Sequence, residues 1–189
     1  PEDRVTYREV GRAFERAFGA AEALRLLRRG RGALGPNSLA MEIGDMLAAM
    51  DDPLGAAEEW ALAVGDDGSQ ISTVIRRVQA LTKESEEAGE RVGERLASSA
   101  ISARRKAAAR AALDLNIRSL VFGLVRDAAN DLEGRERSAF LSDAARRARD
   151  RGLNEVASWA YDQLGAGAST LAERRQFDQG IVEAALAVG

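Results

Sequence analysis

The sequence predicts an all-α protein in which pairs of helices follow one another as a solenoid. The first reason is a pattern that recurs after 33 residues, with Gly11 matched by Gly44 and Ala23 matched by Ala56. A repeat of this length is typical of two-helix units that bury their apolar faces against their neighbours. The second reason is the scarcity of strand signals, because alternating β-branched or aromatic runs hardly occur and only three prolines interrupt the 189 residues.

The first hairpin is predicted from helical spacing and from the residues that end it. Val10, Phe14 and Phe18 fall on one face of a helix. A second helix follows, and Gly30 with the glycines after it and Pro36 is expected to end that helix. The expected ranges are 5–18 and 20–30.

The second hairpin begins and turns at capping residues. Asn37 or Ser38 is expected to cap its first helix. Asp52 followed by Pro53 indicates the start of its second helix, because an aspartate accepts free backbone N–H groups and proline fits the first helical turn. The expected ranges are 39–50 and 53–64.

Capping signals also divide the rest of the chain. Ser85 and Asn154 are expected to be N-caps, Asn116 separates two helices, and Gly152 ends another. The segment Thr170–Glu173 reads as a capping box. The expected ranges are 70–81, 85–99, 102–114, 117–132, 137–151 and 154–165, followed by a last helix from 170.

Composition argues against several classes of function. The chain has no cysteine and no histidine, so disulfides, thiolate or imidazole metal sites and the commonest general base are all excluded. Acid pairs such as Asp51/Asp52 and Glu58/Glu59 lie in loops or first turns, where neighbouring side chains do not converge on a substrate. We therefore predict a protein that is not an enzyme and that holds no cofactor and no metal.

Charge and hydropathy give further expectations about partners and origin. The net charge of −3 gives no general attraction to nucleic acid or to anionic membranes, and no run of 18 apolar residues predicts a membrane span. The first residue is Pro1, so we expect an excerpt or a processed product, either cytoplasmic or periplasmic after signal removal. The 25 arginines against two lysines are typical of a GC-rich bacterial genome.

On the repeated residues, the chain resembles the tetratricopeptide repeat family. That family places a glycine on the first helix of each unit, and a small alanine followed four residues later by an aromatic on the second helix. Gly44, Ala56 and Trp60 supply these residues in one unit, and Gly11 and Ala23 supply them in the unit before. The small residues leave room for close helix approach, and the bulky ones fill the space between hairpins.

The resemblance is fair over residues 5–66 and degenerate over residues 67–189, where the apolar-glycine pair is missing. It implies a right-handed α-α superhelix of about five antiparallel helical hairpins plus a terminal helix, forming one repeat domain over 1–189. Divergent helical repeats and a right-handed array of plain α-hairpins are the alternative interpretations.

The resemblance also implies a non-enzymatic scaffold that binds a partner protein or peptide in its concave groove. A regulatory or adaptor domain of a larger enzyme or transcription regulator is one alternative function. A structural subunit of an assembly is another, with its surfaces covered by sister chains.

Arginines on the first helices are the predicted partner-binding residues. Arg8, Arg12 and Arg16 recur at intervals of four residues, which aligns them along one helix. A basic groove of this kind would hold an acidic peptide or a C-terminal carboxylate through forked hydrogen bonds, although the Lys and Asn residues of some family members are absent. A solvated helix face is the alternative. The full predicted set is Arg8, Arg12, Arg16, Arg77, Arg104 and Arg146, with Trp159 as an anchor if it is exposed.

Other conspicuous segments are interpreted structurally. The run 30–35 matches the dinucleotide fingerprint but follows a helix, so we interpret it as a turn between hairpins. The run 165–170 is interpreted as a linker with a cap, although an anion could rest there. The basic clusters 104–106 and 146–149 lack interleaved aromatic residues, which argues against nucleic acid. Trp60 is predicted to lie in the core.

Overall fold

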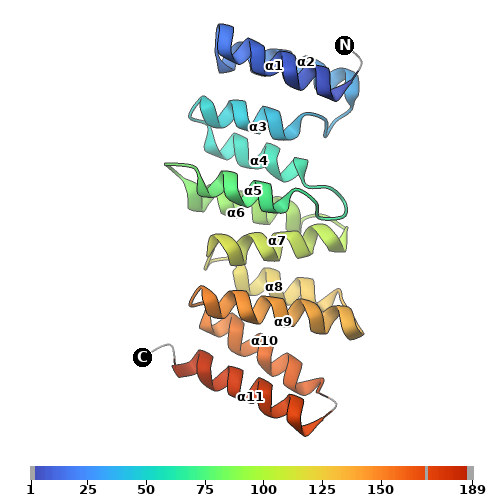
Figure 1. Ribbon diagram of the computed structural model, residues 1–189, viewed down its shortest axis with the longest axis vertical. Helices are drawn as coiled ribbons and strands as arrows, with labels where there is room; N and C mark the ends of the chain where they lie inside the picture. The colour runs from blue at the N-terminus through green and yellow to red at the C-terminus, as the bar shows by residue number, and fades with distance from the viewer. Residues whose placement is uncertain (1–2, 169, 187–189) are drawn as a thin grey trace. The chain divides into compact units, whose positions relative to one another are not determined.

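The structure is a computed structural model that describes residues 3–168 and 170–186, and within these residues the regular secondary structure is entirely α-helical (Figure 1). The all-α prediction is therefore confirmed for this part of the chain. The chain forms two compact units, a first unit up to Leu96 and a second unit from Ala97 on. The helices are α1 (Arg4–Phe18), α2 (Ala20–Leu34), α3 (Ala40–Ala49), α4 (Pro53–Ala63), α5 (Ile71–Gln79), α6 (Ser85–Ala97), α7 (Ser102–Leu115), α8 (Val121–Asn130), α9 (Gly134–Asp150), α10 (Asn154–Ala166) and α11 (Leu171–Leu186).

In the first unit, consecutive helices pack on one another from α1 to α5. Ion pairs also join alternate helices. Arg31 of α2 donates from Nη1 to Oε1 of Glu59 on α4 at 2.9 Å, and Arg91 of α6 lies 3.5 Å from Glu58 on the same α4. Ion pairs therefore join α2 to α4 and α4 to α6.

Glycine lets bulky side chains lie against α1 and α3. A Cβ atom added at Gly11 would lie 2.9 Å from a methyl carbon of Leu27, and one added at Gly44 would lie 2.5 Å from the indole ring of Trp60. At Gly44 a side chain would displace the rigid indole ring and would also meet the carbonyl oxygen of Ala56 at 3.1 Å, whereas at Gly11 only the end of the flexible Leu27 side chain would have to move. The two contacts are related by the 33-residue period, and Trp60, with 2% of its surface exposed, is confirmed as a core residue.

In the second unit, consecutive helices pack from α7 to α11, and α7 also contacts α9 while α8 contacts α10. Alanine dominates the buried positions here. The alanines of this unit with less than 2% of their surface exposed are Ala108, Ala109, Ala111, Ala112, Ala128, Ala129, Ala144, Ala145, Ala148, Ala157, Ala160 and Ala184.

The structure corrects the prediction for residues 30–35. These residues are not a turn, because α2 continues to Leu34 and ends at Gly35, whose φ of 114° suits glycine. Gly30 is buried inside the helix, where an added Cβ would lie 2.6 Å from the ring of Tyr7. The glycine therefore serves close packing within a helix and not the end of one.

Three predicted N-caps also differ in detail. The N-cap of α3 is Leu39, in a left-handed conformation and without a side-chain cap, because the Ser38 hydroxyl donates instead to the carbonyl oxygen of Leu34 at 3.1 Å. Ser85 and Asn154 are each the first residue of their helix, one position later in the helix than an N-cap. The helix expected from residue 117 begins at Val121, after a turn that follows the left-handed C-cap Asn116.

Other capping predictions are confirmed. The Asp52 carboxylate accepts from the backbone N–H of Gly55 at 2.8 Å, with Pro53 in the first turn of α4. In the capping box, Thr170 Oγ1 accepts from the Glu173 N–H and a Glu173 carboxylate oxygen accepts from the Thr170 N–H, both at 3.1 Å. Ser169, part of the predicted linker, lies outside the described residues.

Candidate partner-binding groove

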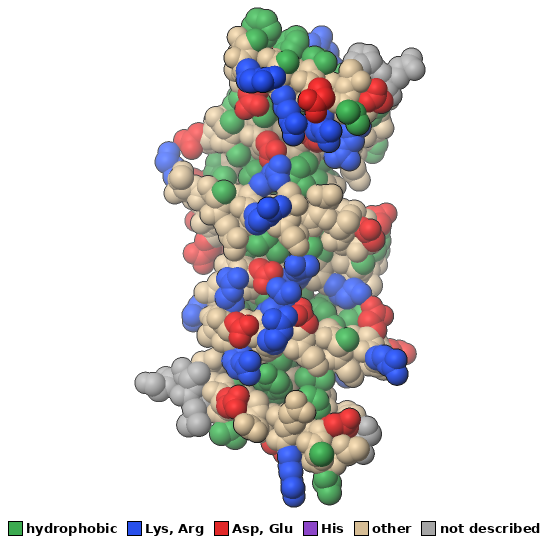
Figure 2. All heavy atoms as spheres, in the orientation of Figure 1, with side chains coloured by type: hydrophobic (Ala, Val, Ile, Leu, Met, Phe, Trp, Pro, Cys, Tyr) green, Lys and Arg blue, Asp and Glu red, His purple; other side chains and the backbone are tan. Residues whose placement is uncertain are grey.

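A cavity of about 280 Å³ in the first unit brings three of the predicted arginines together. Its walls come from α1, α3 and α5, with an apolar floor that includes Leu27. Figure 2 shows basic and acidic side chains interleaved over α1. We call this cavity the groove, and its lining residues are Arg8, Gly11, Arg12, Glu15, Leu27, Met41, Glu42, Asp45, Met46 and Arg77.

Arg77 of α5 is bound to Asp45 of α3 by two hydrogen bonds, Nε to Oδ1 at 2.5 Å and Nη2 to Oδ2 at 2.7 Å. The same Asp45 oxygen also accepts from the indole N–H of Trp60 at 3.0 Å. The hydrogen bond with Asp45 raises the pKa of Arg77, and this effect outweighs the opposing effect of partial burial. The charge of Arg77 is thus already compensated within the protein.

Arg8 and Glu42 bring unsatisfied polar atoms into the groove. The Nε of Arg8 is buried and has no hydrogen-bond partner among the described residues, since Glu9 lies 3.4 Å away without suitable alignment. Oε2 of Glu42 is likewise buried without a hydrogen bond, because the nearest cation, Arg4, is 3.7 Å away. A buried donor or acceptor left unpaired costs roughly 1–3 kcal/mol. Arg8 and Glu42, which both line the groove, therefore each carry a buried polar atom that no described residue satisfies.

The other two arginines of α1 differ from each other. Arg12 lines the groove and is well exposed, with its Nη1 3.4 Å from Glu9. Arg16 donates from Nε to the carbonyl oxygen of Arg12 at 3.3 Å and does not line the groove. The four-residue spacing of the sequence therefore brings two of the three arginines to one site.

Arg104 and Arg146 belong to the second unit. Arg104, on α7, has only 9% of its surface exposed. Arg146 is exposed and its Nη2 donates to Asp143 at 2.5 Å. The neighbouring Arg147, which the sequence analysis did not select, makes the longer-range link, because its Nη1 donates to both oxygens of Asp114 at 2.8 and 2.9 Å.

The link between Asp114 and Arg147 is the counterpart of the link between Asp45 and Arg77. It joins α7 to α9 over 33 residues, as the other joins α3 to α5 over 32 residues. Burial tends to raise the pKa of Asp143, but hydrogen bonds from Arg147 and Arg146 lower it below its ordinary value. The predictions for Arg104 and Arg146 as partner-binding residues stay predictions.

Trp159 of α10 packs edge-on against Phe122 of α8, with 5.7 Å between the ring centroids. Its side chain is half-buried and lies against apolar residues of both core clusters of the second unit. This geometry is typical of a packing residue. The role of Trp159 as an interface anchor stays a prediction.

The second unit has a larger cavity, of about 390 Å³, which was not predicted from the sequence. It lies among α9, α10 and α11, and its charged lining residues, Arg149 and Glu183, are 3.6 Å apart. Gly180 contributes to its wall, and a Cβ added there would lie 2.9 Å from the Tyr161 ring. This cavity is therefore neutral and amphipathic, whereas the groove is strongly charged.

None of the helices in 3–168 and 170–186 is both long and apolar enough to span a membrane. In the same part of the chain, no group of three or more Asp, Glu, His or Cys side chains gathers as a metal site would require.

No protein-family model, curated protein or solved structure shows significant similarity to this chain.

Proposed function

We propose that this protein is a tetratricopeptide-like scaffold without catalytic activity, a right-handed superhelix of helical hairpins that binds a partner protein or peptide in the groove of the first unit. The observation that carries this proposal is that Arg8 and Glu42 line the same cavity and that each has a buried side-chain atom without a hydrogen bond, Nε and Oε2 respectively. A partner that supplies an acceptor and a donor would satisfy both.

The periodic contacts support the superhelical part of the proposal. The close approach of Gly11 to Leu27 recurs 33 residues later between Gly44 and Trp60. An ion pair between odd-numbered helices likewise occurs in each unit, at separations of 32 and 33 residues. Stacked hairpins produce contacts of this kind, because each hairpin meets its neighbour through equivalent residues.

A phage-displayed library of random twelve-residue peptides, selected on the immobilised protein, tests the proposed function. We expect selected peptides to lose binding when Arg8→Glu and Arg12→Glu are combined, since the groove would then repel an acceptor. The double change Arg25→Glu and Arg28→Glu on α2 is the matched control, because both arginines are exposed and lie outside the groove. A library without any enriched peptide, or equal losses in the two double variants, would contradict the proposal.

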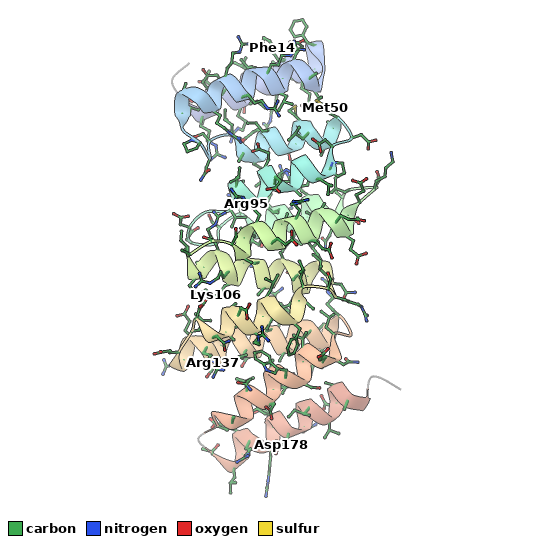
Figure 3. The ribbon with its side chains drawn as sticks, turned by 180° about the vertical axis from the view of Figure 1, so that it is seen from behind. Phe14, Met50, Arg95, Lys106, Arg137 and Asp178 are labelled. Carbon is green, nitrogen blue, oxygen red and sulfur yellow. The ribbon has the colours of Figure 1, made fainter. Side chains whose placement is uncertain are left out.

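A structural subunit of an assembly is the second candidate function, and the apolar surface of α1 favours it. Phe18 has 65% of its surface exposed and Val5 has 56%. Phe14, labelled in Figure 3, lies 5.2 Å from Phe18 between ring centroids, so the two rings form a small apolar patch. Sedimentation analysis of the wild type and of Phe18→Ser tests this function, which predicts an oligomer that the substitution dissociates.

A further inference from the structure

We infer that the groove of the first unit selects a polypeptide segment of mixed charge, in which a carboxylate and a basic group lie close together. This inference rests on the proposed function and specifies the partner's chemistry. It differs from the prediction made from the arginines alone, which was an acidic partner. The reason is that the groove is lined by three arginines and also by three carboxylates, namely Glu15, Glu42 and Asp45.

One pair of these charges is internal to the protein. Arg77 and Asp45 are joined by two hydrogen bonds, and Trp60 donates a third hydrogen bond to Asp45. Breaking a pair that is held in this way leaves an uncompensated charge, so a ligand gains little by competing for either partner. The charges available to a ligand are therefore those of two arginines and two glutamates.

The arginines form the positive side of the groove. Arg8 has a buried Nε that lacks a hydrogen bond, and Arg12 reaches only an exposed Glu9 at 3.4 Å. Exposed pairs of this length contribute little stability and exchange readily. A carboxylate of the ligand would complete the hydrogen bonds of Arg8 and would replace the loose contact of Arg12.

The glutamates form the negative side. Glu42 has a buried Oε2 without a hydrogen bond, and its nearest cation is the exposed Arg4 at 3.7 Å. Glu15 lines the same cavity, and no side-chain partner of Glu15 occurs among the described residues. A ligand with two carboxylates would bring its second negative charge beside these glutamates, and like charges at an interface disfavour binding.

The floor and the size of the groove fit a short stretch of polypeptide. Leu27, Met41 and Met46 supply apolar and adaptable contacts for the aliphatic part of a lysine or arginine side chain. The volume of about 280 Å³ falls just below the roughly 300–1,000 Å³ of pockets that enclose drug-sized molecules. The groove therefore suits one or two side chains of a larger partner.

Three peptide sub-libraries test this inference. Each consists of twelve-residue peptides that are uncharged and random except at two central positions, which are separated by one residue. These positions hold one Asp and one Arg in either order, two Asp, or two Arg. An equimolar mixture is bound to the 189-residue protein at low salt, and sequencing of the bound fraction gives the enrichment of each class.

We expect the mixed-charge class to be enriched about tenfold over each of the other two, as one additional charge-assisted hydrogen bond would give. In the Glu42→Gln variant, the mixed-charge class should no longer be enriched over the two-Asp class. Arg8→Gln combined with Arg12→Gln should remove its advantage over the two-Arg class. Glu94→Gln, at an exposed position of α6, and Arg25→Gln are the matched controls and should leave both ratios unchanged. Thermal melts of every variant confirm folding.

Each other outcome is decisive. Equal enrichment of the two-Asp and mixed classes by the wild type would overturn the inference and leave a simply basic groove. Ratios that do not respond to Glu42→Gln or to the arginine changes would also overturn it. If no class is enriched while the fully random library yields groove-dependent binders, the inference fails and the proposed function stands. Failure of both libraries would overturn both.

Discussion

The two units use different side chains to bring neighbouring helices together. In the first unit a glycine faces a bulky side chain, as Gly44 faces Trp60 and Gly11 faces Leu27. In the second unit most buried positions are alanines and Gly123 of α8 has no atom within 4 Å of an added Cβ, although Gly180 of α11 faces the Tyr161 ring as the glycines of the first unit face bulky side chains. A bulky side chain packed against glycine and an alanine packed against an alanine both allow two helices to approach closely, because each combination leaves little side-chain volume at the contact.

The link between odd-numbered helices is preserved despite this difference. Asp45 pairs with Arg77 in the first unit and Asp114 pairs with Arg147 in the second. The comparison indicates that the apolar signature of a helical repeat can change from glycine to alanine while an ion pair keeps its period. The sequence differs in the same way, because the pair of an apolar residue and glycine occurs at its repeat position up to residue 66 and is missing from the equivalent positions beyond it.

The largest difference between the units is expected for their tryptophans. Trp60→Ala should lower the free energy of unfolding by about 3–5 kcal/mol, because a large buried side chain leaves a cavity. Trp159→Ala should cost only about 1–3 kcal/mol, because Trp159 is half-buried and loses one edge-on ring contact. Urea unfolding followed by circular dichroism measures both values. Equal losses would mean that the two units do not differ in how they pack.

The glycines should respond with opposite signs. Gly44→Ala is expected to destabilise by about 1–3 kcal/mol, since the added Cβ meets the Trp60 ring at 2.5 Å and the carbonyl oxygen of Ala56 at 3.1 Å. Gly123→Ala is expected to stabilise by about 0.4–1 kcal/mol, because alanine restricts the unfolded chain and finds open space in α8. The same unfolding measurement applies. A stabilising effect at Gly44 would contradict the close contact that defines the first unit.

Acid sensitivity should be the smallest difference, and it should follow the network of Arg147. The pKa of Asp143 is lowered in the folded protein, so its stabilisation is present above the unfolded value of about 3.9 and is lost as the pH falls through the lower folded value. In Arg147→Gln, the free energy of unfolding should therefore fall less steeply below about pH 4 than in the wild type. The difference should be less than about 1 kcal/mol, because the Asp143 carboxylate is half-exposed.

Urea unfolding between pH 2.5 and 7, followed by circular dichroism, checks this effect. Arg126→Gln serves as the control, because Arg126 pairs only with its exposed neighbour Asp127. An acid limb that is the same in the wild type and in Arg147→Gln would show that this network does not contribute to stability.

Local signals explain what could be predicted from the sequence. The helix start at Asp52, the end at Gly152 and the capping box at Thr170–Glu173 each depend on a few neighbouring residues. The end of α2 could not be predicted in this way. Gly30 lies inside α2 with the Tyr7 ring packed closely against it, and a glycine that serves close packing cannot be distinguished by sequence from one that ends a helix.

Only some of the residues that line the groove could be predicted from the sequence. The spacing on α1 predicted Arg8 and Arg12, but Asp45 was not among the predicted site residues, because its partner Arg77 lies on another helix. A signal did exist in the repeat register. Arg12, Asp45 and Arg77 follow one another at 33 and 32 residues, and all three line the groove, where Asp45 and Arg77 are joined by hydrogen bonds.

A double-mutant cycle on Asp45→Asn and Arg77→Gln, repeated on Asp114→Asn and Arg147→Gln, tests most directly whether equivalent odd-numbered helices are linked in both units. Urea unfolding of the wild type, the single variants and the double variant gives the coupling free energy of each pair. We expect a coupling of about 1 kcal/mol for both pairs, because both are partly buried, one bidentate through two nitrogens of Arg77 and the other formed by Nη1 of Arg147 with both oxygens of Asp114. A coupling near zero in either unit would contradict a periodic link between the hairpins.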